Sequence, residues 1–459
     1  KIDAKGDIVP ACAESWSISP DGRRYEFKIK KNLKWEDGTR LNAGDFKFAL
    51  DRIIDSETNS PFLEKYLNIE NAAEVNSKEM PKSALGVSVD EKGTLIIKLN
   101  SPDNYFLSLM AESSSLPCNE RFFYDAKGKY GLTPESFLAN GAFKITSRNS
   151  DMIVLQQNER AENPAKVEKF YLCTGRGDPM KLFMEERSEA VIVPFEREQE
   201  MGQSFQSSLF DRSFVLMINP KSIVGENSTM RKILIESILS GGVWSAMGEN
   251  VMVSQGIIPP TVFVLDKNYR ESVGAYVYPK AYFNKAEAKD EFFGELTALE
   301  LEKLPKTTLI TSSGEPCFSF AGAMQQIWSH DLSTYINIEQ PTETELYGKI
   351  AKNNYDLAIT PIKTAQNDVW EFLNCFSDCV ITIDGETGLT GDFLSNVKDL
   401  NTAEIMAEAY KKIEFALIDS NFVLPLYYAP THFVVSTRVK DIEYIPEKRS
   451  IYFGNAQVV

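Results

Sequence analysis

The chain has 459 residues, 43% of them hydrophobic, so it can bury large cores. At the usual domain size this length allows about two to four domains. Its 49 Lys and Arg residues against 65 Asp and Glu residues give a net charge of −16. That charge argues against a nucleic-acid partner, since phosphate binding needs a basic face. No stretch approaches the roughly 20 apolar residues that a transmembrane helix requires.

Residues 10–54 predict strands, turns and a capped helix in quick succession. Asp37-Gly38 supplies a turn, because glycine enters left-handed conformations without a side-chain penalty. Asn42 and Asp45 stand where a helix capping pair should stand. The period-2 pattern of a half-buried strand precedes this turn at Tyr25, Phe27 and Ile29, and helical spacing follows it at Phe46, Ala49, Leu50, Ile53 and Ile54.

Further strands and helices are predicted towards the middle of the chain. A hairpin turns around residues 90–93, between strands that hold residues 87–89 and 95–99. Strand-like segments are expected at 143–145, 153–155 and 190–193, with a helix near 179–187. These segments alternate with loops and indicate a mixed α/β chain.

The clearest topology lies between residues 305 and 360. Strands at 308–311, 336–338 and 356–360 alternate with helices at 319–332 and 343–352. This βαβαβ order predicts a parallel, doubly wound sheet. Ligands of such sheets bind beyond the carboxyl ends of the strands, which here are 312–314 and 360–362. Near the carboxyl terminus, Thr402 caps a helix with one apolar face, and residues 422–428 form a buried strand.

Residues 10–46 also carry an ordered signature. The run reads P-x-x-A-E-S-W-x-x-S-x-D-G-x-x-Y-x-F-x-I-K-K-x-x-K-W-x-D-G-T-x-L-x-A-x-D-F. It resembles the signature of the family 5 solute-binding proteins of ABC transporters, which include oligopeptide, dipeptide and nickel receptors. Further positions agree with the oligopeptide receptors, at 60–63, 66–67, 101–102, 105–106, 140–144, 355–358 and 424–428.

The resemblance implies an α/β, two-lobed fold of the periplasmic-binding-protein type II class, with doubly wound sheets, a hinge and an extra α+β subdomain. We expect this accessory subdomain at residues 1–120, the larger lobe at 121–217 with 429–459, and the second lobe at 218–428. The family usually carries a further segment before the signature, which supplies the first strands of the larger lobe. We therefore expect those strands to be absent and the chain to be processed or truncated.

Catalysis is not indicated. The chain has two histidines and neither a Gly-x-Ser-x-Gly nor a Cys-Gly-x-Cys-Trp motif, so nucleophilic triads have little support. Glu185-Glu186 is a carboxylate pair, but adjacent helix positions face different ways. Ser312-Ser313-Gly314 precedes a helix without the lysine of a P-loop. We expect no enzyme and no cofactor.

Cys375 and Cys379 lie four residues apart, and the sequence leaves a local disulfide and two free thiols equally open. A zinc site needs about four ligands, and the chain offers only His330 and His432 beside its cysteines. We therefore expect no metal.

The ligand site follows from the resemblance, position by position. Peptide receptors of this family usually carry a motif resembling Arg-x-Gly-Trp-x-Ala-Asp-Tyr after the Tyr-Asp-Leu-Ala strand, and its aspartate pairs with the α-ammonium of the peptide. The corresponding segment here is 359–366, which we call the clamp segment. It has Ile359, Ile362 and Ala365 where the family has arginine, tryptophan and aspartate.

Three interpretations of this departure stay open. Asp368 or Glu343 binds the amine instead, or the ligand lacks a free amino terminus and Lys363 faces an acidic group. In the third interpretation these are ordinary loop residues.

Other candidate lining residues follow strand 190–193 or lie at the crossing between the lobes. Aromatic rings there could cover ligand side chains, although core packing at the hinge explains them equally well. The full candidate set is Pro194, Phe195, Glu196, Cys317, Glu343, Pro361, Ile362, Lys363, Thr364, Ala365, Asp368, Tyr427 and Tyr428.

We therefore expect an extracytoplasmic receptor that binds a peptide or peptide-like solute in the cleft between the lobes and delivers it to the permease subunits of an ABC importer. We expect a monomer, either periplasmic or a lipid-anchored protein on a Gram-positive surface, with no nucleic-acid partner. One alternative is a receptor for a non-peptide solute, such as a metal chelate, a sugar or an opine. Another is a ligand-sensing regulatory domain.

Overall fold

The computed structural model describes residues 1, 8–103, 105–173, 177–201, 207–246, 251–265, 267–278, 283–312, 314–362, 364, 368–397, 400, 402–445 and 450–459. The chain forms two compact units. Unit 1 contains Lys1–Val191, Val435–Ile445 and Ser450–Val459, and unit 2 contains Ile192–Val434. Unit 2 therefore takes in residues 192–217 and 429–434, which the sequence assigned to the larger lobe.

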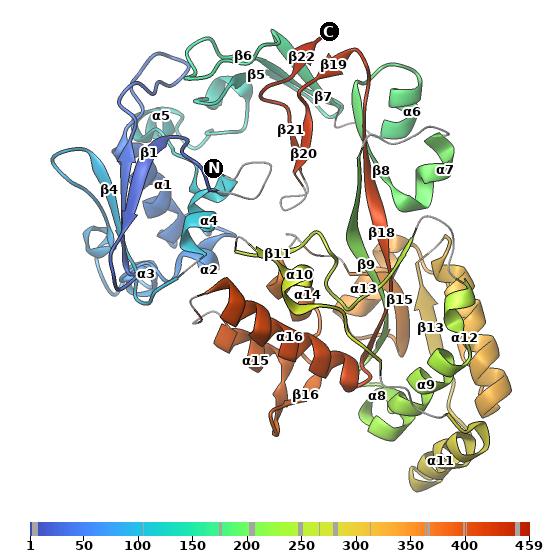
Figure 1. Cartoon of the computed structure of the whole chain (residues 1–459). Helices are drawn as coiled ribbons and strands as arrows, with labels where there is room; N and C mark the ends of the chain where they lie inside the picture. Colours follow the sequence, from blue (N-terminus) through green and yellow to red (C-terminus); the bar gives the residue numbers. More distant parts are fainter. Residues whose placement is uncertain are drawn as a thin grey trace. The chain divides into compact units, whose positions relative to one another are not determined.

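The opening motif folds as predicted within unit 1 (Figure 1). An antiparallel sheet has the order β1-β2-β4-β3, with β1 at Ala13–Ile18, β2 at Arg24–Ile29, β3 at Val87–Val89 and β4 at Thr94–Lys98. Tyr25 and Phe27 of β2 are buried in one core with Phe46 and Leu50 of α1, which spans Ala43–Ile54. Asn42 and Asp45 form the expected capping box at the start of α1.

The rest of unit 1 contains a second antiparallel sheet and short helices. That sheet has the order β5-β6-β7, at Phe143–Arg148, Met152–Gln157 and Lys169–Cys173. The carboxyl-terminal tail packs on it, since the rings of Phe453 and Phe170 stack 4.2 Å apart. The remaining elements are α2 at Leu63–Tyr66, α3 at Ala72–Asn76, α4 at Phe106–Met110, α5 at Glu120–Asp125, α6 at Pro179–Met184, β19 at Val439–Lys440, β20 at Glu443–Ile445, β21 at Ser450–Tyr452 and β22 at Gln457–Val458.

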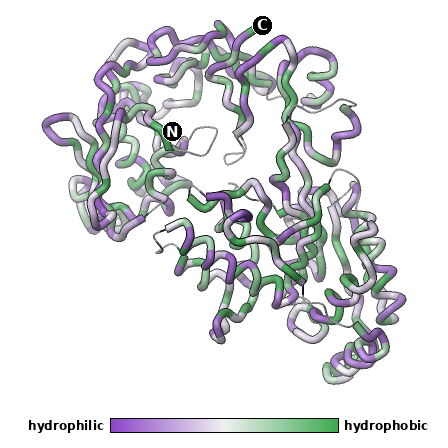
Figure 2. The backbone as a smooth tube through the Cα atoms, viewed as in Figure 1, coloured by the Kyte–Doolittle hydropathy of each residue, from purple (hydrophilic) through white to green (hydrophobic). Residues whose placement is uncertain are grey.

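A mixed seven-stranded sheet, counted over the described residues, forms the centre of unit 2. Its order is β10-β18-β9-β15-β13-β14, and β8 also pairs with β18. The strands are β8 at Ala190–Pro194, β9 at Ser207–Ile218, β10 at Met252–Val253, β13 at Thr308–Thr311, β14 at Asn337–Glu339, β15 at Leu357–Pro361 and β18 at Val423–Val435. Figure 2 shows hydrophobic residues along these central strands.

The predicted βαβαβ unit is confirmed within this sheet. Strand β13 pairs in parallel with β14 and with β15, and the connecting helices are α12 at Cys317–Leu332 and α13 at Glu343–Ala351. Leu309 packs in the core with α12, whereas the next residue, Ile310, packs with Leu346 of α13. Successive strand residues point to opposite faces, so helices cover both faces of this part of the sheet.

Unit 2 has further elements around this sheet. They are α7 at Glu198–Met201, α8 at Ile223–Glu226, α9 at Ser228–Ser240, α10 at Tyr269–Val273, α11 at Lys285–Ala298, α14 at Val369–Asn374, α15 at Thr390–Val397 and α16 at Ala403–Asp419, with small hairpins β11–β12 (Phe263–Val264, Lys267–Asn268) and β16–β17 (Val380–Ile383, Glu386–Leu389). Thr402 caps α16 as predicted.

Strand β18 is longer than predicted. The sequence places its end at residue 428, but pairing with β9 continues through Phe433. Proline cannot donate a ladder hydrogen bond and is tolerated at bulges. Pro430 lies at such a register shift, between Ala429 and Thr431, so the strand passes it without ending.

Three expectations from composition can be set against the structure. All six cysteines lie in the described part of the chain and are free thiols, Cys375 and Cys379 included. Among the residues described, none of the helices has the length and apolarity to span a membrane. The same residues hold no cluster of three or more His, Cys, Asp or Glu side chains suited to a metal ion.

Candidate functional site

The clamp segment continues directly from β15 at one edge of the unit 2 sheet. Pro361 ends β15 opposite Phe214 of β9, and the Ile362 N–H donates to the Ser213 carbonyl at 2.8 Å. The parallel strand β13 ends at the same edge, at Thr311. Helix α12 begins there after Gly314, whose φ of +106° favours glycine. The carboxyl ends of two neighbouring parallel strands therefore meet at this edge, which we call the carboxyl edge.

The rings of Phe214, Tyr427 and Phe320 form a stack next to the carboxyl edge. The Tyr427 ring lies 4.5 Å from the Phe214 ring at 13° and 5.5 Å from the Phe320 ring at 19°. The Arg212 guanidinium carbon lies 5.3 Å from the centre of the Phe214 ring, within cation–π range. A cation therefore lies at the end of a rigid aromatic stack.

Cys317 and Tyr427 of the candidate set are in contact. The Cys317 Sγ lies 3.1 Å from the Tyr427 hydroxyl, and the Ser312 hydroxyl donates to the same sulfur at 3.1 Å. Cys317 is 3% exposed and Tyr427 is 0% exposed. Phe195, which follows β8, belongs to the same core. Their predicted contact with ligand stays a prediction, and the structure gives all three a packing role.

Asp368 and Glu343, the two carboxylates that the sequence offers for the ligand amine, lie on different helices. Asp368 caps α14, because its Oδ1 accepts from the Glu371 N–H at 3.1 Å. Glu343 is exposed in the first turn of α13. A later residue of that helix, Tyr347, donates its hydroxyl to the Pro361 carbonyl at 3.4 Å and so joins α13 to the carboxyl edge.

The structure describes some of the predicted site residues and not others. Lys363 and Ala365 lie outside the described residues. Thr364 is half-buried, Pro194 is half-buried at the end of β8, and Glu196 lies in a short 3-10 helix at Phe195–Arg197. The clamp segment is therefore described up to Ile362 and at Thr364.

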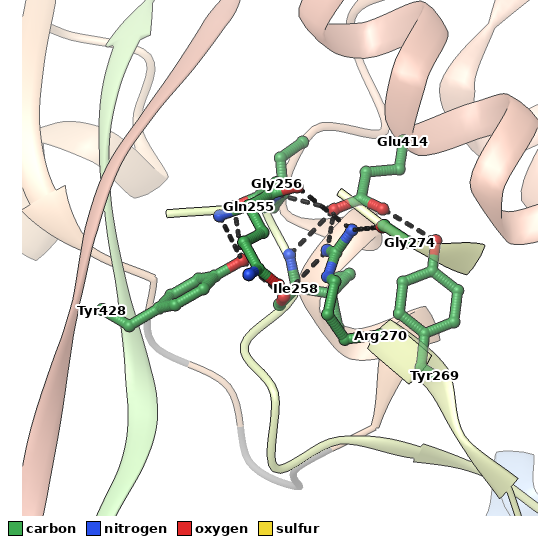
Figure 3. Close-up of polar contacts among 9 residues, drawn as sticks. Gln255, Gly256, Ile258, Tyr269, Arg270, Gly274, Glu414 and Tyr428 are labelled. Atoms are coloured by element: carbon green, nitrogen blue, oxygen red, sulfur yellow. Dashed lines mark hydrogen bonds and ion pairs between the residues drawn. The ribbon is translucent and has the colours of Figure 1, made fainter. Parts of the chain in front are cut away.

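The Tyr428 side chain enters a polar cluster (Figure 3). Its hydroxyl is shared between the Gly256 and Ile258 carbonyls, at 2.9 and 2.8 Å, and the side chain is 0% exposed. A buried ion pair lies in the same cluster, since Arg270 Nη2 is 2.6 Å from Glu414 Oε1. The cluster joins β18, α16 and the segment around residues 255–274.

Backbone and side-chain hydrogen bonds surround both charges of this ion pair, and among the described residues only the Arg270 Nε of the pair lacks a hydrogen-bond partner. Glu414 accepts from the Ile257 and Ile258 N–H groups at 2.7 and 3.0 Å, and from the Tyr269 hydroxyl at 2.8 Å. Arg270 donates to the carbonyls of Gln255 at 3.2 Å, Gly274 at 2.9 Å and Ile258 at 2.8 Å. A Cβ at position 256 would collide with the Glu414 carboxylate, which explains the glycine there.

The pKa values of Tyr269, Arg270 and Tyr428 in this cluster are raised. Burial raises the pKa of Tyr269 well above its ordinary value, and the Glu414 charge adds to this effect. Burial has the largest single effect and lowers the pKa of Arg270, but Glu414 together with Tyr428 and Tyr269 outweighs it, so the pKa of the guanidinium is raised. Arg270 therefore stays charged and Tyr269 stays a donor.

Sequence reasoning missed strand β9. Arg212 and Ser213 in its middle pair with Ala429 and Tyr428 of β18, and the neighbouring Asp211 is only 1% exposed. Charged residues are rarely buried in a strand without a specific role. The interruption of an apolar run by Asp211-Arg212-Ser213 was therefore a usable signal. Arg212 therefore places a guanidinium beside the aromatic stack.

Replacing Glu414 by Gln should destabilise unit 2. The variant leaves the Arg270 guanidinium buried without its counter-charge, which typically costs about 3 to 5 kcal/mol. Urea denaturation would measure the loss. The control is Glu408→Gln on the same helix, whose exposed pair with Lys411 at 3.2 Å should contribute less than about 1 kcal/mol. Equal losses in the two variants would contradict the role assigned to Glu414.

Comparison with known proteins supports the resemblance seen in the sequence. Residues 7–172 match the model of the bacterial extracellular solute-binding proteins, family 5 Middle. The dipeptide-binding protein of Bacillus subtilis is 26% identical over 344 residues, covering 72% of this chain and 61% of that protein. The oligopeptide-binding protein of Bacillus subtilis is 22% identical over 480 aligned residues, covering 99% of this chain and 86% of that protein.

A solved structure shows the same fold. The substrate-binding domain of an oligopeptide ABC transporter from Bacillus anthracis superposes with a TM-score of 0.70 at 20% identity, covering 100% of this chain and 92% of that one. The matched family consists of solute-binding proteins rather than enzymes. Residues 7–172, about a third of the chain, are thus similar to the bacterial extracellular solute-binding proteins, family 5, and the signature at residues 10–46 lies within this match.

Proposed function

We propose that this chain is the solute-binding receptor of an ABC importer and holds a peptide or peptide-like ligand at the carboxyl edge of the unit 2 sheet. The observation that carries the proposal is the position of the clamp segment. The segment continues from β15 at the edge of the sheet where β13 also ends. There the Ile362 N–H donates a hydrogen bond to the Ser213 carbonyl of β9. Ligands of such sheets bind beyond these strand ends.

The names of the relatives support a peptide ligand, since both Bacillus subtilis proteins are named for peptides. Extended peptides are often held by backbone hydrogen bonds, which leave no side-chain signature. The finer fold proposal is a two-lobed receptor with a hinge and an accessory α+β subdomain at the amino-terminal end. We further propose an extracytoplasmic monomer, periplasmic or lipid-anchored, that delivers its ligand to the permease subunits.

The structure bears on which clamp residue meets the ligand. Asp368 uses one carboxylate oxygen to cap α14, and Glu343 is exposed on α13. Both observations weigh against a dedicated ammonium clamp at these positions. Arg212 adds a cation to the same edge, beside the aromatic stack. We therefore favour a ligand with an acidic group that faces Lys363.

A non-peptide ligand is the second candidate. It is favoured by Ile359, Ile362 and Ala365 at the positions where peptide receptors of the family carry arginine, tryptophan and aspartate. Ile359 is fully buried in β15 and Ile362 is 6% exposed. The two isoleucines are thus packed inside unit 2, where a guanidinium or an indole N–H would need a polar partner.

Native mass spectrometry of the purified protein should reveal co-purified ligand. The expected result is a heterogeneous set of short peptides, because backbone pairing tolerates different side chains. Denaturing mass spectrometry of the released fraction would identify them. A single non-peptide mass would contradict the peptide proposal and support a non-peptide ligand.

Replacing Lys363 by Ala should weaken acidic ligands selectively. Loss of a charge-assisted contact of about 1.5 to 3 kcal/mol lowers affinity roughly 10-fold to 150-fold. Calorimetric titration with matched acidic and neutral peptides would measure the difference, with exposed Lys303→Ala as the control. The neutral peptide should bind both variants equally. Unchanged affinity for the acidic peptide in Lys363→Ala would rule out the role of Lys363.

A further inference from the structure

A pocket opens at the other ends of the same strands. It has a volume of about 340 Å³ and lies where β13 and β15 begin and β9 ends. Thr308 and Asp356 line it from the starts of β13 and β15, and Asn219 lines it from the end of β9. Small-molecule sites usually measure about 300 to 1,000 Å³, so this pocket has the size of a small-ligand site.

A buried asparagine fixes the walls of this pocket. Asn219 is 2% exposed, and its side-chain amide donates to the carbonyls of Asn353 at 3.0 Å and Tyr355 at 2.6 Å. Its Oδ1 accepts from the Lys221 N–H at 3.0 Å, and its own N–H donates to the Asp356 carbonyl at 2.9 Å. These bonds hold the loop after β9 and the loop before β15 in one arrangement, so the pocket is pre-formed.

The pocket presents both signs of charge. Lys349 and Glu339 line it as an ion pair with a separation of 3.2 Å. Asp356 accepts the Thr308 N–H through Oδ2 at 2.9 Å, and within the described part of the chain its other oxygen has no hydrogen bond. The exposed Lys221 has no carboxylate within 4.0 Å among the described residues. One ammonium and one carboxylate oxygen therefore remain to meet a ligand of complementary charge.

We propose that this pocket binds a small zwitterion of the amino-acid class. The carboxylate of the ligand is held by Lys221, and its ammonium is held by the Asp356 oxygen that has no hydrogen bond among the described residues. Charge-assisted hydrogen bonds of this kind are roughly twice as strong as neutral ones, and the charges of the pocket match both ends of such a molecule. This site lies at the opposite strand ends from the carboxyl edge and goes beyond the proposed function.

Isothermal titration calorimetry of the whole chain with L-alanine tests the proposal. The unmodified protein should bind L-alanine, and acetate and ethylammonium, which each carry one of its charges, should bind at least about tenfold more weakly. Lys221→Met should lower the affinity for L-alanine about tenfold or more. Asp356→Asn should do the same, since the amide oxygen can still accept the Thr308 N–H and preserve the fold.

The matched control is Lys232→Met, an exposed lysine of α9 outside the pocket, which should bind like the unmodified protein. Amide chemical shifts should change at 219–222 and 353–356. Absence of L-alanine binding at millimolar concentration, equal binding by all variants, or shifts confined to 361–364 would each overturn the proposal. Peptide binding measured on Lys221→Met separates the two sites, because the proposed function predicts that it is unchanged.

Discussion

The ion pair between Arg270 and Glu414 is the contact on which the arrangement of unit 2 depends. Glu414 is 0% exposed, and such a charge is tolerated in a protein interior only when a counter-charge and hydrogen bonds replace its water. Its partners come from parts of the chain that are far apart, since Arg270 and Glu414 are 144 positions apart in the sequence. The same cluster takes up Tyr428, so it fixes α16 and the 255–274 segment against β18. The hydrogen bonds of these buried charges therefore determine how α16 and the 255–274 segment lie against the sheet.

The attachment of α16 and the 255–274 segment to β18 affects both ends of the sheet. Strand β18 carries Tyr428 towards the cluster and Tyr427 towards the aromatic stack, so one strand links the buried charges to the carboxyl edge. At that edge the polar and aromatic groups come from β9, β15, β18 and α12, all packed in one core. At the opposite ends of the strands, Asn219 organises a pocket through its own hydrogen bonds. A rigid sheet with well-separated ends suits a protein that holds ligands without changing them.

Local patterns predicted the local structure well. The capping pair Asn42 and Asp45, the hairpin around 90–93 and the βαβαβ unit all follow from short-range rules, and the structure confirms them. The hairpin β16–β17 went unpredicted although Asp384-Gly385, both with positive φ, is a strong turn signal. Strand β9 was missed although the Asp211-Arg212-Ser213 interruption marks it, because its second half, from Ser213, is buried on both faces and lacks a simple alternation. The Arg270–Glu414 pair could not be found from local patterns, since a contact between residues 144 positions apart leaves no local trace. For the site, the clamp segment stays a prediction from the sequence, whereas the position of Arg212 beside the aromatic stack follows only from the pairing of β9 with β15 and β18.

Hydrogen–deuterium exchange with and without a mixture of short peptides is the most direct test of the claim that this receptor holds its ligand at the carboxyl edge. Ligand contact lowers local opening and slows exchange where the backbone is held. Our account predicts slower exchange in the first turn of α12, in the clamp segment from Ile362 and in the start of β9. Protection that is confined to unit 1, or to 219–222 and 353–356, would contradict it.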